Sequence, residues 1–168
     1  MSTTTPPQRA PSGAQLNADE LASWRGLLRT HARVTRVLDA ELVAAHGLPL
    51  SSYEVLLFLD NSPHGRLRMA ELADSVLLSR SGLTRMVDRL EQGGLVRRET
   101  CPSDLRGFNA VLTESGRAAL REARKTHLSG VRRTFFEHFS VEEQRLLGAY
   151  FDRVLEGLED RGAAPPER

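Results

Sequence analysis

The feature that most restricts the fold of this chain is a block at residues 69–116, where two helical patterns are followed by two strand patterns. Residues 69–76 place their apolar side chains on one face of a short helix. After a tight turn, Ser79 is a suitable N-cap for a second helix over residues 80–92. The pair Gly93-Gly94 then supplies the usual stop signal. The spacing predicts a helix-turn-helix.

A β-hairpin is predicted directly after this pair of helices. Residues 95–100 and 108–113 have strand character, and the loop between them, residues 101–107, has turn-forming residues at both ends. We expect Arg106 to lie at the tip of this loop and to enter a narrow minor groove of DNA. The order of elements predicts a mainly α fold with a small β-hairpin wing, a winged helix-turn-helix.

The second helix of the block has an apolar and a polar face. The apolar residues recur at helical spacing and are predicted to face the core: Leu83, Met86, Val87 and Leu90. The other side is predicted to contact DNA through Arg80, Ser81, Thr84, Arg85 and Arg89. Arg85 can pair with both acceptors of guanine, and Ser81 and Thr84 can contact base edges or phosphates. Arg80 and Arg89 are better placed for phosphates.

Acidic residues are interspersed with these arginines. Asp88 can either hold Arg85 or Arg89 in place, the interpretation we favour, or accept a hydrogen bond from a cytosine amino group. Asp104 is expected to brace the wing by holding an arginine of the preceding strand. Between positions 66 and 106, eight arginines stand against six acidic residues. A cationic surface therefore depends on how these charges are distributed in space.

Amphipathic helices are predicted on both sides of the block. They cover residues 18–45, residues 49–60 with Ser51 or Ser52 as cap, residues 113–138 from Thr113, and the segment after Ser140, which forms a capping-box pattern with Glu143. The outer helices carry more apolar surface than the central block can cover, so we expect a two-fold homodimer. The predicted organisation is disordered tails at 1–17 and 161–168, dimerisation regions at 18–48 and 114–160, and a DNA-binding domain at 49–113.

Composition excludes several classes of protein. The 168 residues have a net charge of only +1, so overall charge gives no argument for nucleic acid. The sequence contains no P-loop, GxGxxG, GxSxG or HExxH motif, no secretory signal and no apolar run long enough to span a membrane. A single cysteine, Cys101, fits a reducing compartment. We therefore expect a cytoplasmic protein that is not an enzyme and uses no cofactor.

Four segments together resemble the MarR family of bacterial transcription regulators. They are LLSRSGLTRMVDRLE at 77–91, GGLVRR at 93–98, DLRG at 104–107 and VLTESG at 111–116. The resemblance covers residues 20–160 and implies a triangular homodimer on a pseudo-palindromic operator, usually acting as a repressor. It also implies that Arg106 is the wing arginine, while Leu105 stands where the family often has a basic residue.

The resemblance further implies a small phenolic or aromatic acid that releases DNA. Trp24, Arg25 and His31 supply an aromatic ring, a cation and a hydrogen-bonding group within two helical turns. The simpler interpretation is that Trp24 packs at the dimer interface, His31 lies in the core and Arg25 is solvated. An unreactive role is favoured over oxidant sensing for Cys101. The histidines show no compact metal-ligand spacing, so no metal site is predicted.

These observations predict a sequence-specific transcriptional regulator, most simply a repressor relieved by an aromatic ligand, with double-stranded DNA and a second copy of itself as partners. The alternative is a winged-helix dimer that binds other proteins and has little affinity for DNA. Loss of DNA binding in Arg85→Ala and Arg106→Ala would separate the two hypotheses.

Overall fold

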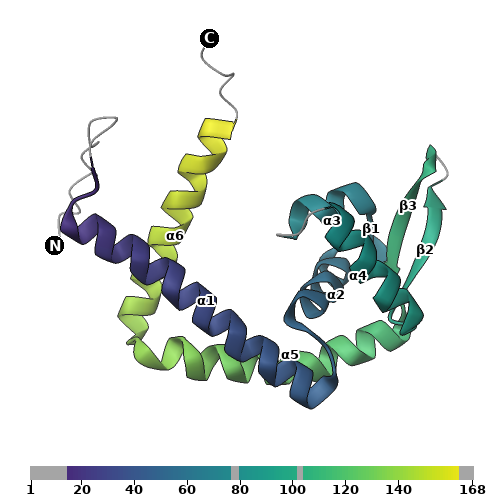
Figure 1. The fold of residues 1–168 in the computed structure, drawn as a ribbon, viewed down its shortest axis with the longest axis horizontal. Helices are drawn as coiled ribbons and strands as arrows, with labels where there is room; N and C mark the ends of the chain where they lie inside the picture. Colours follow the sequence, from purple (N-terminus) through teal and green to yellow (C-terminus); the bar gives the residue numbers. More distant parts are fainter. Residues whose placement is uncertain (1–14, 77–79, 102–103, 163–168) are drawn as a thin grey trace, which may run out of the picture. The chain divides into compact units, whose positions relative to one another are not determined.

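The computed structural model describes residues 15–76, 80–101 and 104–162, and the chain divides into two compact units, residues 1–33 and 34–168. The predicted turn at 77–78, the Ser79 cap and most of the two predicted tails lie outside the described residues. The elements, labelled in Figure 1, are α1 (Ala18–His46), α2 (Leu50–Asn61), η1 (Pro63–Gly65), β1 (Arg66–Arg68), α3 (Met69–Ser75), α4 (Arg80–Gln92), β2 (Val96–Cys101), β3 (Asp104–Leu112), α5 (Glu114–Thr134), η2 (Phe136–His138) and α6 (Val141–Gly162).

The first unit consists of the beginning of α1. Asn17 caps this helix, because its Oδ1 accepts hydrogen bonds from the backbone N–H groups of Asp19 and Glu20, each at 2.9 Å. The Glu20 carboxylate accepts one in return from the Asn17 N–H at 2.8 Å, which completes a capping box. The apolar side chains of this stretch are about half exposed: Trp24, Leu27 and Leu28.

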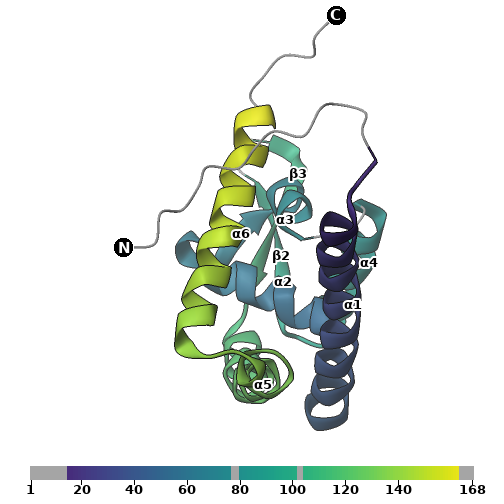
Figure 2. The same cartoon turned by 90° about the vertical axis from the view of Figure 1, so that its left-hand side faces the viewer.

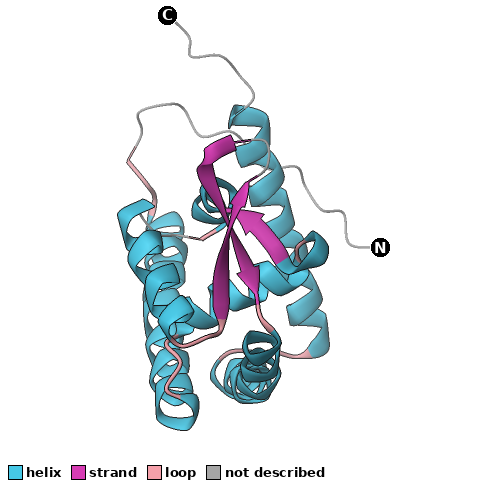
Figure 3. Ribbon diagram, turned by 90° about the vertical axis from the view of Figure 1, so that its right-hand side faces the viewer, coloured by secondary structure: helices cyan, strands magenta, loops and turns pink. Residues whose placement is uncertain are grey.

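The second unit contains one antiparallel sheet, shown in magenta in Figure 3, with the strand order β1-β3-β2. Strand β1 was not predicted, because three residues are too few to show an alternating pattern. The expected loop at 101–107 is also wrong, since Cys101 pairs with Asp104 and Arg106 lies within β3 instead of at a loop tip. Thr100 of β2 pairs with Phe108 of β3, but the next residue, Cys101, pairs with Asp104. The three residues between these partners, 105–107, therefore form a bulge in β3.

The core of this unit lies between α4, the sheet and helices α2, α3 and α5. All four predicted core positions of α4 are buried, and they pack with residues from each of these elements: Leu56, Leu59, Leu72, Val96, Ala110 and Leu120. The helical spacing of the apolar residues therefore predicted the buried face of α4 correctly.

The start of α2 differs from the prediction. Neither Ser51 nor Ser52 caps the helix, which begins at Leu50 with Pro49 in the cap position. The backbone N–H of Leu50 donates instead to Oδ1 of Asp39 on α1, at 2.8 Å. A side chain from another helix thus satisfies an N–H group that the local sequence leaves without an acceptor.

The helix that begins after Thr113 is shorter than predicted. Thr113 caps α5 as expected, accepting from Gly116 N at 2.9 Å, but α5 ends at Thr134 and not at 138. At Phe135 the backbone leaves the helical conformation, and the ring of Phe135 packs against those of Phe136 and Phe139, with centroids 5.2 Å apart in both pairs.

Helix α6 begins with the predicted capping box. The Glu143 carboxylate accepts from Ser140 N at 2.8 Å and from Ser140 Oγ at 2.7 Å, and these bonds lower the pKa of the Glu143 carboxyl. Figure 2 looks along α5 and shows α6 leaving its end. The helix continues to Gly162, two residues into the predicted C-terminal tail. Its apolar side chains are between about 40% and 70% exposed, namely Val141, Leu146, Tyr150, Phe151, Val154, Leu155 and Leu158.

None of the helices in the described parts of the chain is by itself long and apolar enough to cross a membrane. Helices α1 and α2 meet both conditions only as a pair, which is bent by 83° at the break between them.

We predict that Gly116→Ala destabilises the fold. The new methyl group would meet the Leu95 carbonyl oxygen and lie 2.7 Å from Cδ1 of Leu112, both in the packed junction of α5 with the sheet. We expect the free energy of unfolding to fall by about 1–3 kcal/mol in urea titrations. Gly148→Ala in α6, where nothing lies within 4 Å, is the control and should be neutral or slightly stabilising. Equal effects would show that the motif glycine is not needed for close packing.

Candidate nucleic-acid interface

The polar face of α4 is the part of the second unit that best suits contact with DNA. Ser81, Thr84, Arg85 and Arg89 are exposed on the side opposite the buried leucines. Arg80 is the first residue of α4, but its side chain is not among those described. The structure therefore brings four of the five predicted residues of this helix together on one accessible surface.

The end of α4 turns the chain directly into the wing. Gly94 has a φ of +70°, and the N–H groups of Gly94 and Leu95 donate to the carbonyls of Glu91 and Leu90, both at 2.9 Å. These are the two hydrogen bonds of a Schellman motif, which requires a left-handed residue that glycine adopts without strain. Strand β2 consequently begins beside the C-terminal end of α4, as Figure 1 shows.

Arg98 on β2 joins the wing to α4 through several contacts, which we call the Arg98 bridge. Its Nη2 lies 2.6 Å from Oδ1 of Asp88, and its Nη1 lies 2.9 Å from Oε2 of Glu91. Its backbone N–H donates to Oε1 of Glu91 at 2.9 Å, and Nη2 also approaches the Thr84 carbonyl at 3.5 Å. Three residues of the helix, spread over about two turns, are therefore connected to one strand residue.

The Arg98 bridge corrects the expected role of Asp88. This carboxylate holds Arg98 of the wing, not Arg85 or Arg89 of its own helix. The sequence offered one sign of this arrangement, because Asp88 and Glu91 lie one turn apart on the same helix, just before a two-glycine turn. A turn that short returns the next strand to the last turns of the helix, within reach of both carboxylates.

Glu99 of β2 is also paired with arginines of the sheet. Glu99 forms ion pairs with Arg66, at 3.9 Å, and with Arg97. Among the side chains that the structure describes, neither Arg85 nor Arg89 takes part in an ion pair. Asp88, Glu91 and Glu99 are thus matched to arginines of the sheet, and Arg85 and Arg89 remain available for phosphates or guanine.

The residues at the far end of the wing are described only by their backbone. Arg106 and Asp104 both lie in β3, and Cys101 ends β2, but their side chains are outside the described set. The carboxylates that contact Arg97 and Arg98 are those of Glu99, Asp88 and Glu91. The bracing role of Asp104 and the groove contact of Arg106 therefore stay predictions.

The predicted effector residues lie in the first unit and are exposed. Trp24 is 52% exposed, and Arg25 and His31 are exposed as well, so a single chain does not enclose them.

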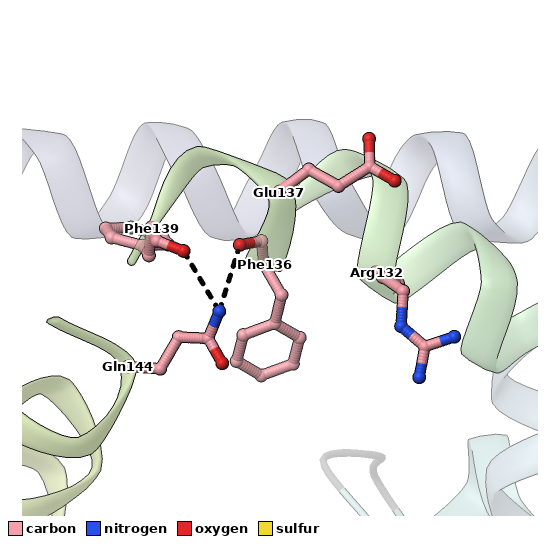
Figure 4. A pocket seen from close by; sticks show the side chains of 5 residues that line it. All are labelled: Arg132, Phe136, Glu137, Phe139 and Gln144. Atoms are coloured by element: carbon pink, nitrogen blue, oxygen red, sulfur yellow. Dashed lines mark hydrogen bonds between the residues drawn. The ribbon is translucent and has the colours of Figure 1, made fainter. Parts of the chain in front are cut away.

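A hollow occurs elsewhere, at the turn between α5 and α6, and is lined by Arg132, Phe136, Glu137, Phe139 and Gln144 (Figure 4). There the Gln144 amide donates to the Phe136 and Phe139 carbonyls at 3.3 and 3.0 Å, which holds the turn together.

The histidines do not form a metal site in the described part of the chain, where no group of three potential ligands occurs. His127 is instead a packing residue. Its ring lies 4.5 Å from that of Tyr53, its Nδ1 is buried without a hydrogen-bond partner, and burial lowers the pKa of the imidazole. The ring therefore links α5 to α2 in its neutral form.

Comparisons with known proteins place this geometry in a family. A profile of the MarR family matches residues 46–107, from the end of α1 into β3. Sco3205, a MarR family transcriptional regulator from Streptomyces coelicolor solved in complex with DNA, is 40% identical, with a TM-score of 0.78 and coverage of 86% of this chain and 94% of that chain. AbsC, a MarR family regulator from the same organism, is 34% identical, with a TM-score of 0.77 and coverage of 88% and 99%. The chain belongs to the MarR family.

A further relative is the HTH-type transcriptional repressor YetL of Bacillus subtilis, 26% identical over 151 residues that cover 88% of this chain and 89% of YetL. The MarR-family profile ends at position 107, within the bulge of the wing. Family membership confirms the resemblance inferred from the sequence and the winged helix-turn-helix fold. This MarR-family protein is a DNA-binding transcriptional regulator.

We predict that Arg98→Ala destabilises this MarR-family fold more than Arg97→Ala. Removing Arg98 leaves Asp88 and Glu91 without their cation, and its side chain is only 25% exposed. The expected loss is about 1–3 kcal/mol, measured by urea unfolding. Arg97 is 56% exposed and pairs with Glu99 at the surface, so its removal should cost under about 1 kcal/mol. The interpretation fails if the two variants unfold alike.

Proposed function

We propose that this MarR-family regulator is a homodimeric repressor that binds a pseudo-palindromic operator through α4 and the wing. The observation that carries the proposal is the exposed face of α4, where Arg85 and Arg89 are outside the ion pairs of the described side chains. Thr84 and Ser81 share that face, and such side chains can contact base edges or phosphates. Arg80 of α4 and Arg106 of β3 belong to the same proposed DNA contact, and Asp104 to the bracing of the wing.

Dimerisation is supported by the apolar surface that a single chain leaves uncovered. Trp24, Leu27 and Leu28 in the first unit are exposed, and so is most of the apolar side of α6 in the second. Apolar surface on this scale is typical of an interaction site, and a closed two-fold dimer is the commonest solution. The proposed division assigns residues 18–48 and 114–160 to the dimer and 49–113 to DNA.

Repression and its relief form the finer part of the proposal. YetL is named as a repressor, and a dimer that covers an operator blocks transcription simply by occupying it. We assign the effector to the class of small aromatic acids, with Trp24, Arg25 and His31 as candidate contacts that gain a cleft when the dimer forms. We also propose that the protein acts in the bacterial cytoplasm, where its chromosomal operator lies.

We predict that Arg85→Ala weakens operator binding by about five- to a hundredfold and relaxes base preference at one position of each half-site. Arg106→Ala should weaken binding and reduce the slope of log affinity against log salt by about one for each phosphate that is no longer neutralised. Fluorescence anisotropy with fragments from a genome-wide selection, across a salt series, measures both effects.

The matched control for these variants is Arg145→Ala, an exposed arginine of α6 that pairs with Glu142 outside the proposed interface. Its operator affinity and salt slope should equal those of the unaltered protein. If Arg85→Ala and Arg106→Ala also left binding unchanged, the proposed DNA contacts would be wrong and the alternative, an adaptor for other proteins, would gain support.

We predict that the protein sediments at twice the 18.6 kDa of one chain. Leu155→Asp, which places a carboxylate on the apolar side of α6, should raise the dimer dissociation constant roughly a hundredfold or more. Asp152→Lys, a charge change at an exposed polar position of the same helix, is the control. A monomeric unaltered protein, or an unaffected Leu155→Asp dimer, would contradict this assignment of the interface.

A further inference from the structure

Phe108 is a large apolar side chain that the wing leaves in solvent. It lies in β3 opposite Thr100 of β2, directly after the bulge at residues 105–107, and is 45% exposed. Ala110, two residues farther along the same strand, is fully buried. An isolated exposed ring means little by itself, so its significance depends on what lies beside it.

Phe108 lies on the face of the hairpin that is turned toward α4. Arg98 pairs with Ala110 in the sheet register, and the Arg98 side chain contacts Asp88 of α4. Side chains alternate along a strand, so Phe108 and Thr100 project from the same face as Ala110 and Arg98. Phe108 is about 7 Å farther along the hairpin, a distance set by the rise of two strand residues. On this face Ala110 is therefore part of the core, whereas Phe108 is left open to solvent.

The hairpin is joined directly to the helix that is proposed to contact DNA. Strand β2 starts at the C-terminal end of α4, where Leu95 N bonds to Leu90 O, and the Arg98 side chain reaches back as far as the Thr84 carbonyl. The Arg98 side chain thus joins the hairpin to the half of α4 that carries Thr84 and Arg85. Along β3, Phe108 lies between Ala110, which pairs with Arg98, and Arg106 in the bulge.

We propose that Phe108 is a DNA-contacting residue, whose ring packs against deoxyribose and thymine methyl groups beside the recognition helix. The inference rests on the proposed operator binding and adds an apolar contact to a surface that is otherwise cationic. Apolar contact with the thymine methyl is one of the ways proteins distinguish bases. Because such a contact displaces no counterions, its contribution to affinity is independent of salt, unlike that of an arginine on a phosphate.

The test compares Phe108→Ala with the unaltered protein on its strongest selected operator fragment, by anisotropy at several salt concentrations. Burying about half of a phenylalanine side chain predicts roughly a tenfold loss of affinity at every salt concentration. The slope of log affinity against log salt should not change. Phe58→Ala removes another exposed aromatic side chain, 38% exposed on α2, and should bind as the unaltered protein does. Circular dichroism of both variants checks that each remains folded.

Two results would overturn the proposal for Phe108 alone. One is unaltered affinity of Phe108→Ala while Arg85→Ala loses binding. The other is a reduced salt slope in Phe108→Ala, which would mean that the wing had moved and carried its arginines away from phosphates. Absence of operator binding by the unaltered protein is a different outcome, because it would overturn the proposed function and this inference together.

Discussion

The Arg98 bridge is the interaction on which the proposed DNA-binding surface depends. A recognition helix and a wing contact one duplex together only if the distance and angle between them are fixed, and here one guanidinium joins β2 to Asp88 and Glu91 of α4. The bridge also determines the charge of the surface. Both carboxylates of the helix are directed to the wing, so that they neither oppose phosphates nor hold Arg85. The contact of Arg98 with Asp88 and Glu91 therefore has two effects. It joins the wing to α4, and it keeps both carboxylates away from the cations of α4.

The rest of the fold serves to position that surface. The glycine pair after α4 returns the chain at once, the buried side of α4 fixes the helix on the sheet, and Gly116 allows α5 to begin against the Leu95 carbonyl. The apolar residues of α6 and of the first unit contribute little to this core. The proposed dimer would account for their exposure and would also set the separation of two recognition helices.

Much of this arrangement was predictable because it follows local rules. The faces of α4, the Thr113 cap and the Ser140–Glu143 capping box follow from side-chain spacing and hydrogen-bonding type. What the sequence did not predict depends on contacts between distant residues. The N-terminus of α2 is capped by Asp39 from another helix, β1 exists only because β3 pairs with it, and Asp88 finds its partner across a turn. The bulge at 105–107 depends likewise on strand register, which turn-forming residues alone do not specify.

The most direct test of the account is a hydroxyl-radical footprint of the protein on its selected operator. A two-fold dimer with one α4 in each major groove predicts two protected segments related by a dyad, with centres about one helical turn, roughly 10–10.5 base pairs, or a multiple of it apart. Protection should extend outward from each half-site, where the wing approaches the adjacent backbone. A single protected segment, or two segments with no symmetric relation, would contradict the account.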